Sequence, residues 1–515
     1  MDELLSFLRA YPPALTNKRA NASDTPIRST TIGLVNVRQQ RAASLSRFAG
    51  KHDFELVRLV LGLLRDTRIR GDGPDSFTSF TVNVDAPMKL HKDGRNDGQS
   101  YVVAMGPFQG GELFVESPPG GCDHEEARVY TTESGETVSG TKVDPKNRWY
   151  RFDGAKTRHA VLPFTGGTRV SVVFFSVPSQ TCRPDDLNVL ANLGFPSPSP
   201  ALCPYIIRIC STRRPGSISN HTLRQIGLDG SVPMSAVGLC LRDDVDRAAY
   251  AHLGLPMQVL DAPGGLPEQR ALCTRHLPAG SWCLLVDDDI TKIHCPEGWG
   301  LHLLTMAGFI LAKQRVAHLW GLNTNANARC LRENVSDALG LINGHFYGLI
   351  AGRDCGKTPL SDNHGGAAED VERSLRHYLD RGLVRLNWAA ALAKHSNNPG
   401  GLQSFFGASQ RAAAHKQVLG ALATEFPDML VLADSSPNGC KFLSTHKRRA
   451  KKDLHECDVC GKSYTRASDL NYHQLEHSDT PRPVFPCAHC GKEFRRAKNR
   501  AQHLKCGRCR PQIGQ

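Results

Sequence analysis

The feature that most limits how this chain can fold is a set of four metal-binding side chains near its end. Cys457 and Cys460 are separated by two residues, twelve residues follow, and His473 and His477 are separated by three. A hairpin can bring two thiolates together, and a helix turn can present two histidines on one face, so that the four close a tetrahedron around Zn²⁺. The spacing therefore predicts a small ββα unit that folds around zinc.

A second unit of the same kind follows the first. Cys487, Cys490 and His503 repeat the first three positions at the same spacing. The fourth ligand is a cysteine in place of histidine, either Cys509 or Cys506. We favour Cys509 because its separation from His503 falls within the usual range for such sites. The sequence thus predicts two zinc fingers in tandem.

Positive charge is concentrated in this part of the chain. From Lys441 to the end, 17 Lys and Arg stand against 7 Asp and Glu, which accounts for +10 of the total charge of +13. A basic pair of fingers favours nucleic acid as the binding partner, with DNA preferred and RNA possible. The alternative is a pair of fingers that is purely structural or binds protein. Base-contacting helix positions −1, 3 and 6 point to a set of candidate contacts: Arg466, Tyr472, Arg496, Asn499 and Gln502.

The rest of the chain divides by its patterning. We expect a helical N-terminal segment at 1–74, strands and turns at 75–180, and alternating strands and helices at 203–430. A basic linker at 446–452 precedes the fingers at 455–510. The linker, "HKRRAKK", matches a nuclear import signal or a solvated basic stretch. The fold class is therefore multidomain α/β.

The cysteine pattern and the N-terminal sequence indicate the cellular compartment, and the hydropathy indicates whether the chain spans a membrane. Six of the 17 cysteines lie in the finger region, and the others are scattered. The N-terminus lacks the pattern of a secretory signal. We therefore expect free thiols in a reducing compartment. The longest apolar run, at 303–312, is too short to span a membrane, so we expect no membrane partner. The sequence carries no signal for an oligomeric state.

Four residues in the β-rich segment form an ordered pattern. His91 and Asp93 end an alternating run, His159 lies on a later strand, and Arg169 opens the next strand after a Thr-Gly-Gly turn. Two histidines and a carboxylate bind Fe²⁺ on one face and leave positions open for oxygen and a co-substrate. The forked guanidinium of arginine suits a carboxylate.

This segment resembles the TET/JBP-like group of 2-oxoglutarate/Fe(II) dioxygenases, which oxidise bases in DNA. The resemblance implies a double-stranded β-helix, or jelly roll. It also implies that His91, Asp93 and His159 are iron ligands and that Arg169 anchors 2-oxoglutarate. A jelly roll with incidental polar residues is the alternative.

The segment 203–430 carries acids at the end of a strand and at the start of a helix. "WCLLVDDDI" runs from a buried strand into Asp287, Asp288 and Asp289, and such a strand end can hold a divalent cation against a diphosphate. Glu369 and Asp370 lie in the first turn of a helix, where acids also suit the helix dipole.

The order of these elements resembles the TET/JBP-associated glycosyltransferases of the GT-A type. The resemblance implies a nucleotide-sugar donor and Mn²⁺ or Mg²⁺. The residues it implies are Asp287, Asp289 and His395 for the cation, Asp370 and Glu369 for catalysis, and Arg213, Arg214 and Arg270 for the donor.

Together these parts predict a nuclear enzyme that hypermodifies DNA bases. It would oxidise a pyrimidine methyl group and then attach a sugar to the new hydroxyl. The zinc fingers would direct the enzyme to its sites on DNA. The first alternative is a protein side-chain hydroxylase and glycosyltransferase, a pairing that resembles the lysyl hydroxylases. The second is a zinc-finger scaffold or regulator whose two enzyme folds are inactive.

Overall fold

The computed structural model divides the chain into two compact units, Met1–His446 and Lys447–Gln515. Among the described residues, no helix combines the length and the apolar character that crossing a membrane requires. The residues outside the description are 18–21, 37–41, 118–126, 133, 197–199, 229, 261–265, 276, 353–357, 365, 395–407, 434, 437, 444–454 and, from 458 on, all except 463–464, 470, 473–474, 485–487, 490, 493–494 and 503.

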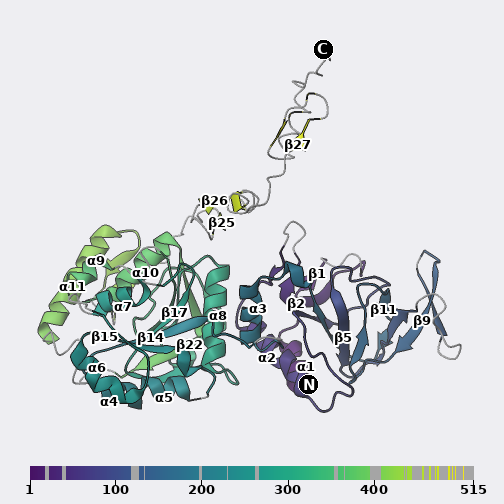
Figure 1. Cartoon of the computed structure of the whole chain (residues 1–515), viewed down its shortest axis with the longest axis horizontal. Coiled ribbons are helices and arrows are strands. Elements are labelled where there is room, and N and C mark those ends of the chain that lie inside the picture. Colours follow the sequence, from purple (N-terminus) through teal and green to yellow (C-terminus); the bar gives the residue numbers. More distant parts are fainter. Residues whose placement is uncertain are drawn as a thin grey trace. The chain divides into compact units, whose positions relative to one another are not determined.

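The first part of unit one is a jelly roll of two antiparallel sheets (Figure 1). The larger sheet has the order β1-β2-β4-β13-β5-β10, with β3 paired to β2, and the smaller has β11-β7-β9-β8. Val102 and Phe152 of the larger sheet share a buried cluster with Leu113 and Val115 of the smaller one, which holds the sheets together. The predicted jelly roll is thus confirmed. Its strands are β1 Leu15–Thr16, β2 Ile27–Val35, β3 Ser44–Leu45, β4 Ser79–Val84, β5 Asp97–Met105, β7 Leu113–Glu116, β8 Ala127–Thr131, β9 Thr137–Val143, β10 Tyr150–Phe152, β11 His159–Val161 and β13 Val170–Ser176, with β6 Gln109–Gly110 and β12 Phe164–Thr165 paired separately.

The predicted helical segment over 1–74 is only partly present. α1 (Asp2–Ala10) and α2 (Lys51–Gly62) are helices. Between them, β2 pairs along the length of β4 and belongs to the larger sheet. The stretch "IRSTTIGLV" is rich in β-branched residues, which pack well on a pleated surface. The jelly roll therefore draws strands from the segment that was predicted to be helical.

The second part of unit one is a nine-stranded mixed sheet with helices packed on it (Figure 1). Its order is β16-β15-β14-β17-β21-β19-β22-β18, with β20 paired to β22. β14 lies parallel to β15 and β17, whereas β17 and β21 are antiparallel. The elements are β14 Tyr205–Ser211, β15 Val237–Leu241, β16 Met257–Val259, β17 Trp282–Asp287, β18 Ile290–His294, β19 Leu319–Asn323, β20 Val335–Ser336, β21 Phe346–Ile350, β22 Leu383–Ala393, α3 Pro184–Asn192, α4 Pro215–Asn220, α5 Thr222–Gly227, α6 Asp244–Tyr250, α7 Leu266–Arg275, α8 Leu301–Gln314, α9 Pro359–Asp362, α10 Glu369–Asp380, α11 Ala408–Glu425, β23 Leu430–Leu432 and β24 Cys440–Phe442.

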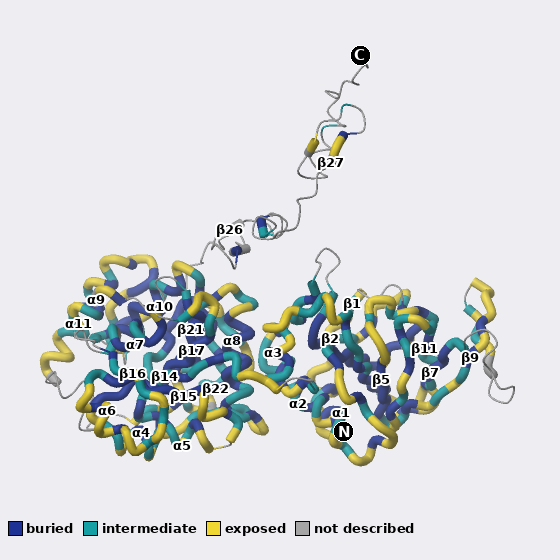
Figure 2. The backbone as a smooth tube through the Cα atoms, viewed as in Figure 1, coloured by how far each residue is buried: buried dark blue, intermediate teal, exposed yellow. Residues whose placement is uncertain are grey.

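Helices cover both faces of this sheet. β17 is buried through nearly its whole length, as Figure 2 shows. Leu284 belongs to the apolar cluster that contains α8, and its neighbour Leu285 belongs to the cluster that contains α10. Successive side chains of a strand point to opposite faces. A strand covered on both faces therefore reads as a continuous apolar run, as "WCLLV" does.

Three parallel strands end side by side at one edge of the sheet. In the register of the sheet, Cys210 of β14 lies opposite Cys240 of β15 and Asp287 of β17. Ligands of open α/β sheets bind in the crevice outside the carboxyl ends of the strands. The acids that follow β17 therefore lie at the edge where a donor nucleotide is expected.

A buried histidine on α10 makes the stability of unit one sensitive to acid. Burial, together with the positive charges of Arg373 and His318, lowers the pKa of His377 from 6.5 to about 3. Below pH 6.5, His377 is therefore protonated in the unfolded chain but stays neutral in the folded chain. The free energy of unfolding then falls as the pH drops below 6.5. Between pH 7 and 5 the loss is about 2 kcal/mol. We expect His377→Leu to reduce the pH dependence of urea unfolding by this amount. Parallel curves for parent and variant would contradict the expectation.

Unit two contains two short antiparallel hairpins. β25 (His455–Glu456) pairs with β26 (Ser463–Tyr464), and β27 (Phe485–Pro486) pairs with β28 (Glu493–Phe494). The helix positions described after them include 470, 473 and 474 in the first finger and 503 in the second. This order, hairpin and then helix, is the predicted ββα arrangement.

Candidate active sites

The predicted iron ligands converge in the jelly roll. Asp93 Oδ1 lies 3.7 Å from His91 Nε2, and Asp93 Oδ2 lies 3.6 Å from His159 Nε2. One ligand atom from each residue lies within 4.8 Å of the other two. The backbones of His91 and His159 exchange hydrogen bonds of 3.0 and 2.9 Å, which fix the two rings side by side. Residues 68 positions apart in sequence thus form one site because their backbones pair in an isolated antiparallel bridge.

Both histidines are oriented by their own local backbone. His91 Nδ1 lies 2.8 Å from the Lys89 carbonyl, and His159 Nδ1 lies 3.1 Å from the Thr157 carbonyl. A carbonyl only accepts, so each Nδ1 carries the hydrogen and each Nε2 keeps its lone pair. Metal-bound histidines are held in this way, with the second ring nitrogen donating to a carbonyl or carboxylate. Two imidazoles and one carboxylate fit Fe²⁺ and leave the remaining positions open.

Arg169 is a buried cation of the jelly roll, directly before β13. Its Nε donates to the Gly111 carbonyl at 3.1 Å, and its guanidinium lies over the rings of Phe108 and Phe164. Burial lowers its pKa to about 10. Asp85 Oδ1 accepts a hydrogen bond of 2.7 Å from the Arg169 backbone N–H. Among the described residues, none forms an ion pair with the guanidinium itself, which Asp144, Asp85 and Glu112 attract from further away. A buried guanidinium with this little compensation fits a carboxylate of the co-substrate.

Gly111 is required for Arg169 to lie where it does. Its φ of +72° suits glycine, and a Cβ at this position would come within 2.7 Å of Arg169 Nε. Any larger residue would displace the guanidinium.

A cavity of the jelly roll borders Asp93. Its volume is about 280 Å³, and Asp93 is part of its wall. The hydroxyls of Thr31 and Thr81 meet at 2.8 Å in the interior sheet face that lines it, and Asn96 and Arg95 lie in the loop after Asp93. The remaining wall is largely apolar, which is the usual composition of a small-molecule site. It is lined further by Leu34, Val35, Asn36, Val173, Phe175 and Val177.

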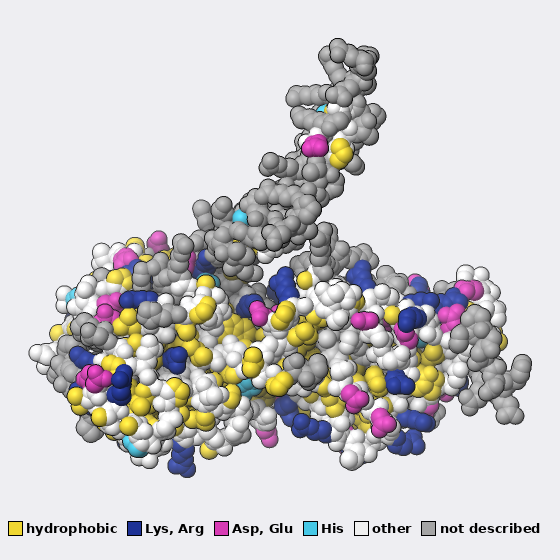
Figure 3. All heavy atoms as spheres, in the orientation of Figure 1, with side chains coloured by type: hydrophobic (Ala, Val, Ile, Leu, Met, Phe, Trp, Pro, Cys, Tyr) yellow, Lys and Arg dark blue, Asp and Glu magenta, His cyan; other side chains and the backbone are white. Residues whose placement is uncertain are grey.

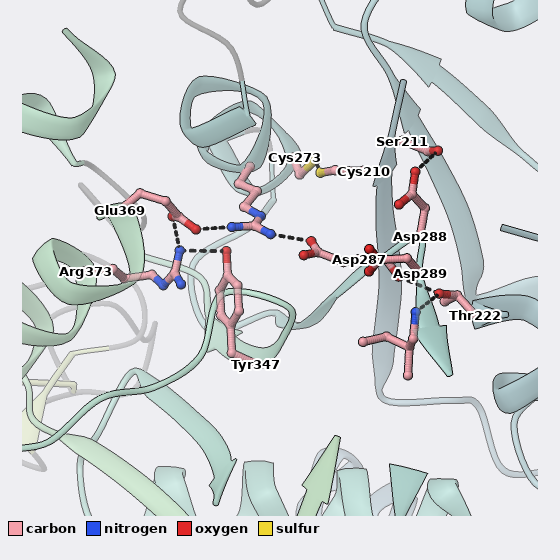
Figure 4. A network of polar contacts seen from close by, with 12 residues as sticks. Cys210, Ser211, Thr222, Cys273, Asp287, Asp288, Asp289, Tyr347, Glu369 and Arg373 are labelled. Carbon is pink, nitrogen blue, oxygen red and sulfur yellow. Dashed lines mark hydrogen bonds and ion pairs between the residues drawn. The ribbon is translucent and has the colours of Figure 1, made fainter. Parts of the chain in front are cut away.

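The three acids after β17 have different surroundings, which Figure 4 shows. Asp287 binds Arg270. Asp288 accepts a hydrogen bond of 2.5 Å from Ser211 and pairs with Arg214 at 3.3 Å, and burial raises its pKa to about 7. Asp289 lies 3.7 Å from Arg214. Asp287 and Asp289, the two acids predicted to bind a cation, are more exposed than Asp288 and so remain the candidates to offer oxygen atoms to it.

Glu369 is held by two arginines. Arg270 binds one of its carboxylate oxygens and Arg373 the other. Arg373 also donates to the Tyr347 hydroxyl at 3.3 Å, and its guanidinium lies 3.9 Å from the centre of that ring (Figure 4). Arg270 therefore connects Asp287 at the end of β17 with Glu369 at the start of α10.

The remaining residues that the sequence predicted for the α/β half are Asp370, Arg213 and His395, and each has different surroundings or lies outside the description. Asp370 accepts a backbone hydrogen bond from Val371 at 2.9 Å. Burial raises the pKa of Cys440 in β24, and the charge of Asp370 adds to this effect. Arg213 pairs with Asp243 and Asp246 of the α6 region, so it is already engaged away from the strand-end acids. His395 lies outside the described residues.

Sequence reasoning missed several members of this network. Ser211 joins Tyr250 at 2.5 Å to Asp288, and nothing in the sequence indicates that link. Arg373 carried a usable signal, because it lies four positions after Glu369 on the same helix face.

Glu369 also stabilises the fold of unit one. Its carboxylate compensates two buried guanidinium groups, and it is itself only 7% exposed. Glu369→Ala would leave Arg270 with Asp287 and Arg373 with the neutral Tyr347 hydroxyl. Loss of one partner of a buried ion pair costs about 3–5 kcal/mol. We expect the free energy of unfolding of unit one to fall by this amount, measured by urea denaturation. Glu425→Ala removes a more exposed partner of Arg376 and should cost about 1 kcal/mol or less.

The zinc ligands of the second finger approach one another. Cys487, Cys490 and His503 place their ligand atoms within 4.8 Å of each other, and Cys490 Sγ lies 3.2 Å from His503 Nε2. In the first finger, Cys457 and His473 are buried. Several predicted residues of this unit lie outside the described residues: Cys460, His477, Cys506, Cys509, Arg466, Tyr472, Arg496, Asn499 and Gln502.

Comparison with known proteins confirms the first finger. The model of the family "Zinc finger, C2H2 type" matches residues 455–477. No curated protein matches the chain. Solved structures similar to it include a 2OG-Fe(II) oxygenase family protein from Burkholderia pseudomallei, at 20% identity and a TM-score of 0.20 over 34% of this chain and 76% of that one. NgTET1 in complex with 5mC DNA gives 14% identity and 0.18 over 34% and 65%.

A different set of solved structures is similar to the α/β half. Glucosyl-3-phosphoglycerate synthase from Mycobacterium tuberculosis, in complex with Mn²⁺ and UDP, gives 12% identity and a TM-score of 0.25 over 47% of this chain and 87% of that one. TM-scores at this level support no argument about activity, which rests on the residues described above.

Proposed function

We propose that this protein is a DNA base-modifying enzyme with two activities. The first oxidises the methyl group of a pyrimidine, and the second transfers a sugar from a nucleotide donor to the resulting hydroxyl. The observation that carries the proposal is the convergence of His91, Asp93 and His159, with both Nε2 atoms facing the same carboxylate. The buried guanidinium of Arg169, which forms no ion pair with a carboxylate among the described residues, supplies the co-substrate anchor.

The residues of the jelly roll have distinct tasks in the first reaction. When bound, ferrous iron and 2-oxoglutarate would let O2 act as the oxidant: one oxygen atom would become the new hydroxyl, and the other would enter 2-oxoglutarate, which would leave as succinate and CO2. His91, His159 and Asp93 hold the metal, and Arg169 fixes the far carboxylate of 2-oxoglutarate. The cavity beside Asp93 receives the base, which has to leave the duplex to reach it. Threonine and asparagine side chains there suit an uncharged heterocycle, and Arg95 at the exposed loop suits a phosphate.

The α/β half is suited to the second reaction. Asp287 and Asp289 offer carboxylate oxygens at the strand edge, and hard divalent cations prefer such ligands. Mn²⁺ or Mg²⁺ there would stabilise the leaving diphosphate. Arg214, on the loop after β14, lies beside Asp288 and Asp289 and is the arginine best placed for the donor phosphates.

The charge distribution supports nucleic acid as the partner and the nucleus as the location. Across the face of unit one in Figure 3, basic and acidic side chains are interspersed. The segment from Lys441 onward carries +10, which favours contact with phosphates. The "HKRRAKK" stretch at 446–452 is the proposed import signal.

The test uses the zinc-loaded full chain with Fe²⁺, 2-oxoglutarate and duplex DNA that contains 5-methylcytosine or thymine. Succinate is followed, and the DNA is digested for nucleoside mass spectrometry. We expect an oxidised base that disappears in His91→Ala, and a glycosylated base once the correct sugar donor is added. Succinate without base oxidation would contradict the proposal in favour of a protein or RNA substrate. If the protein neither binds iron nor forms succinate, the proposal is contradicted and a zinc-finger scaffold is favoured instead.

A further inference from the structure

One arginine is bound to two acids that the sequence predicts to have separate roles. Arg270 contacts Asp287, a predicted cation ligand, and Glu369, a predicted catalytic residue (Figure 4). The arginine is only 5% exposed. The two acids are far apart in sequence and lie on different elements, β17 and α10. The geometry therefore links the cation site to the start of α10 through a single side chain.

The surroundings of Asp287 and Asp289 fit a divalent cation. Their side chains are 26% and 15% exposed, so both can be reached, whereas Asp288 is 7% exposed and is turned towards Ser211. Carboxylate oxygens at such an edge suit Mn²⁺ or Mg²⁺. One of the Asp287 oxygens, however, is already bound by Arg270. A cation that binds Asp287 has to share this carboxylate with a guanidinium of the same charge sign.

We propose that Arg270 is a positioning residue that occupies Asp287 until a divalent cation binds, and then remains on Glu369 alone. This inference rests on the proposed glycosyl transfer and adds a control of its cation site. Glu369 is in this account a positioning residue as well, because its two oxygens are taken by Arg270 and Arg373.

Arg270 keeps an acidic partner, Glu369, when it releases Asp287. Its Nη1 binds Glu369 and its Nη2 binds Asp287, so release of Asp287 leaves the first contact in place. The guanidinium also lies 5.9 Å from the centre of the Tyr347 ring, which gives it a second favourable surface. Loss of Asp287 therefore does not leave the buried charge without compensation.

Competition between cation and arginine for one carboxylate is reciprocal. If Arg270 on Asp287 weakens cation binding, the cation weakens that contact by the same factor. Removal of Arg270 must then tighten cation binding. If Arg270 instead served to shape the site for the cation, its removal would weaken binding. The sign of the change separates the two accounts.

The experiment compares two double variants with the same charge. R270M/E369Q keeps Arg373 and Asp287, and R373M/E369Q keeps Arg270 and Asp287, so each variant loses one positive and one negative charge and the two have the same net charge. Urea unfolding of both variants checks that each is folded. Both are made in the zinc-loaded full chain that also carries H91A and D93A, which removes the jelly-roll site as a competitor for metal. Bound and free Mn²⁺ are measured by electron paramagnetic resonance during titration.

We expect R270M/E369Q to bind Mn²⁺ about tenfold more tightly than R373M/E369Q, within the range usual for coupled sites. Equal affinities, or tighter binding by R373M/E369Q, would overturn the role of Arg270 and leave the proposed glycosyl transfer intact. Absence of Mn²⁺ binding in the H91A/D93A parent would overturn the cation site itself, and with it both this inference and that part of the proposed function.

Discussion

Asp93→Ala is expected to abolish 2-oxoglutarate turnover. Its carboxylate faces both histidine Nε2 atoms, at 3.7 and 3.6 Å, and it is the negatively charged member of the three. Replacing a hydrogen-bonding partner of a metal ligand already costs about 10–100-fold in metal affinity or activity. Loss of a ligand itself should therefore reduce succinate formation by more than about a hundredfold. Binding of Fe²⁺, measured by anaerobic titration, should weaken in parallel.

A matched control for this variant is available on the surface. Asp24→Ala also removes a carboxylate of the jelly roll, but Asp24 is exposed and pairs with Lys89. Turnover by Asp24→Ala should equal that of the parent. If Asp93→Ala kept both iron binding and succinate formation, the three residues would not be the iron site.

Arg169→Met is expected to raise the KM for 2-oxoglutarate by about a hundredfold. A hydrogen bond to a charged group is worth about 1.5–3 kcal/mol, and a forked arginine can make two of them to one carboxylate. Fe²⁺ binding should be unchanged, because Arg169 is not among the three convergent ligands. Steady-state succinate formation at varied 2-oxoglutarate gives the KM directly.

The stability of this variant distinguishes a binding role from a structural one. Burial disfavours the charged form of Arg169 and lowers its pKa to about 10. A methionine of similar volume should therefore leave the melting temperature unchanged or raise it. Arg169→Lys keeps the charge but loses the fork and should lie between parent and Arg169→Met in KM. A collapse in stability with an unchanged KM would show that the arginine supports the fold alone.

Local patterns in the sequence predicted much of this protein correctly. The apolar run of β17 and the alternating strands of the jelly roll were recognisable because side-chain period follows from strand geometry. The error over 1–74 has a physical cause as well. The stretch 27–35 is a strand because β4 is there to pair with it, and a partner remote in sequence is invisible to local patterns.

By itself, the sequence determined the first zinc finger, because its ligands lie within one hairpin and one helix turn, and spacing alone brings them together. Residue type and order also singled out His91, Asp93 and His159, whose ligand atoms converge in the structure. Only the tertiary structure decided that His91 and His159 meet, since their backbones pair across 68 positions of sequence. The link from Arg270 to Glu369, across 99 positions, likewise exists only because α7 and α10 pack on the same face of one sheet.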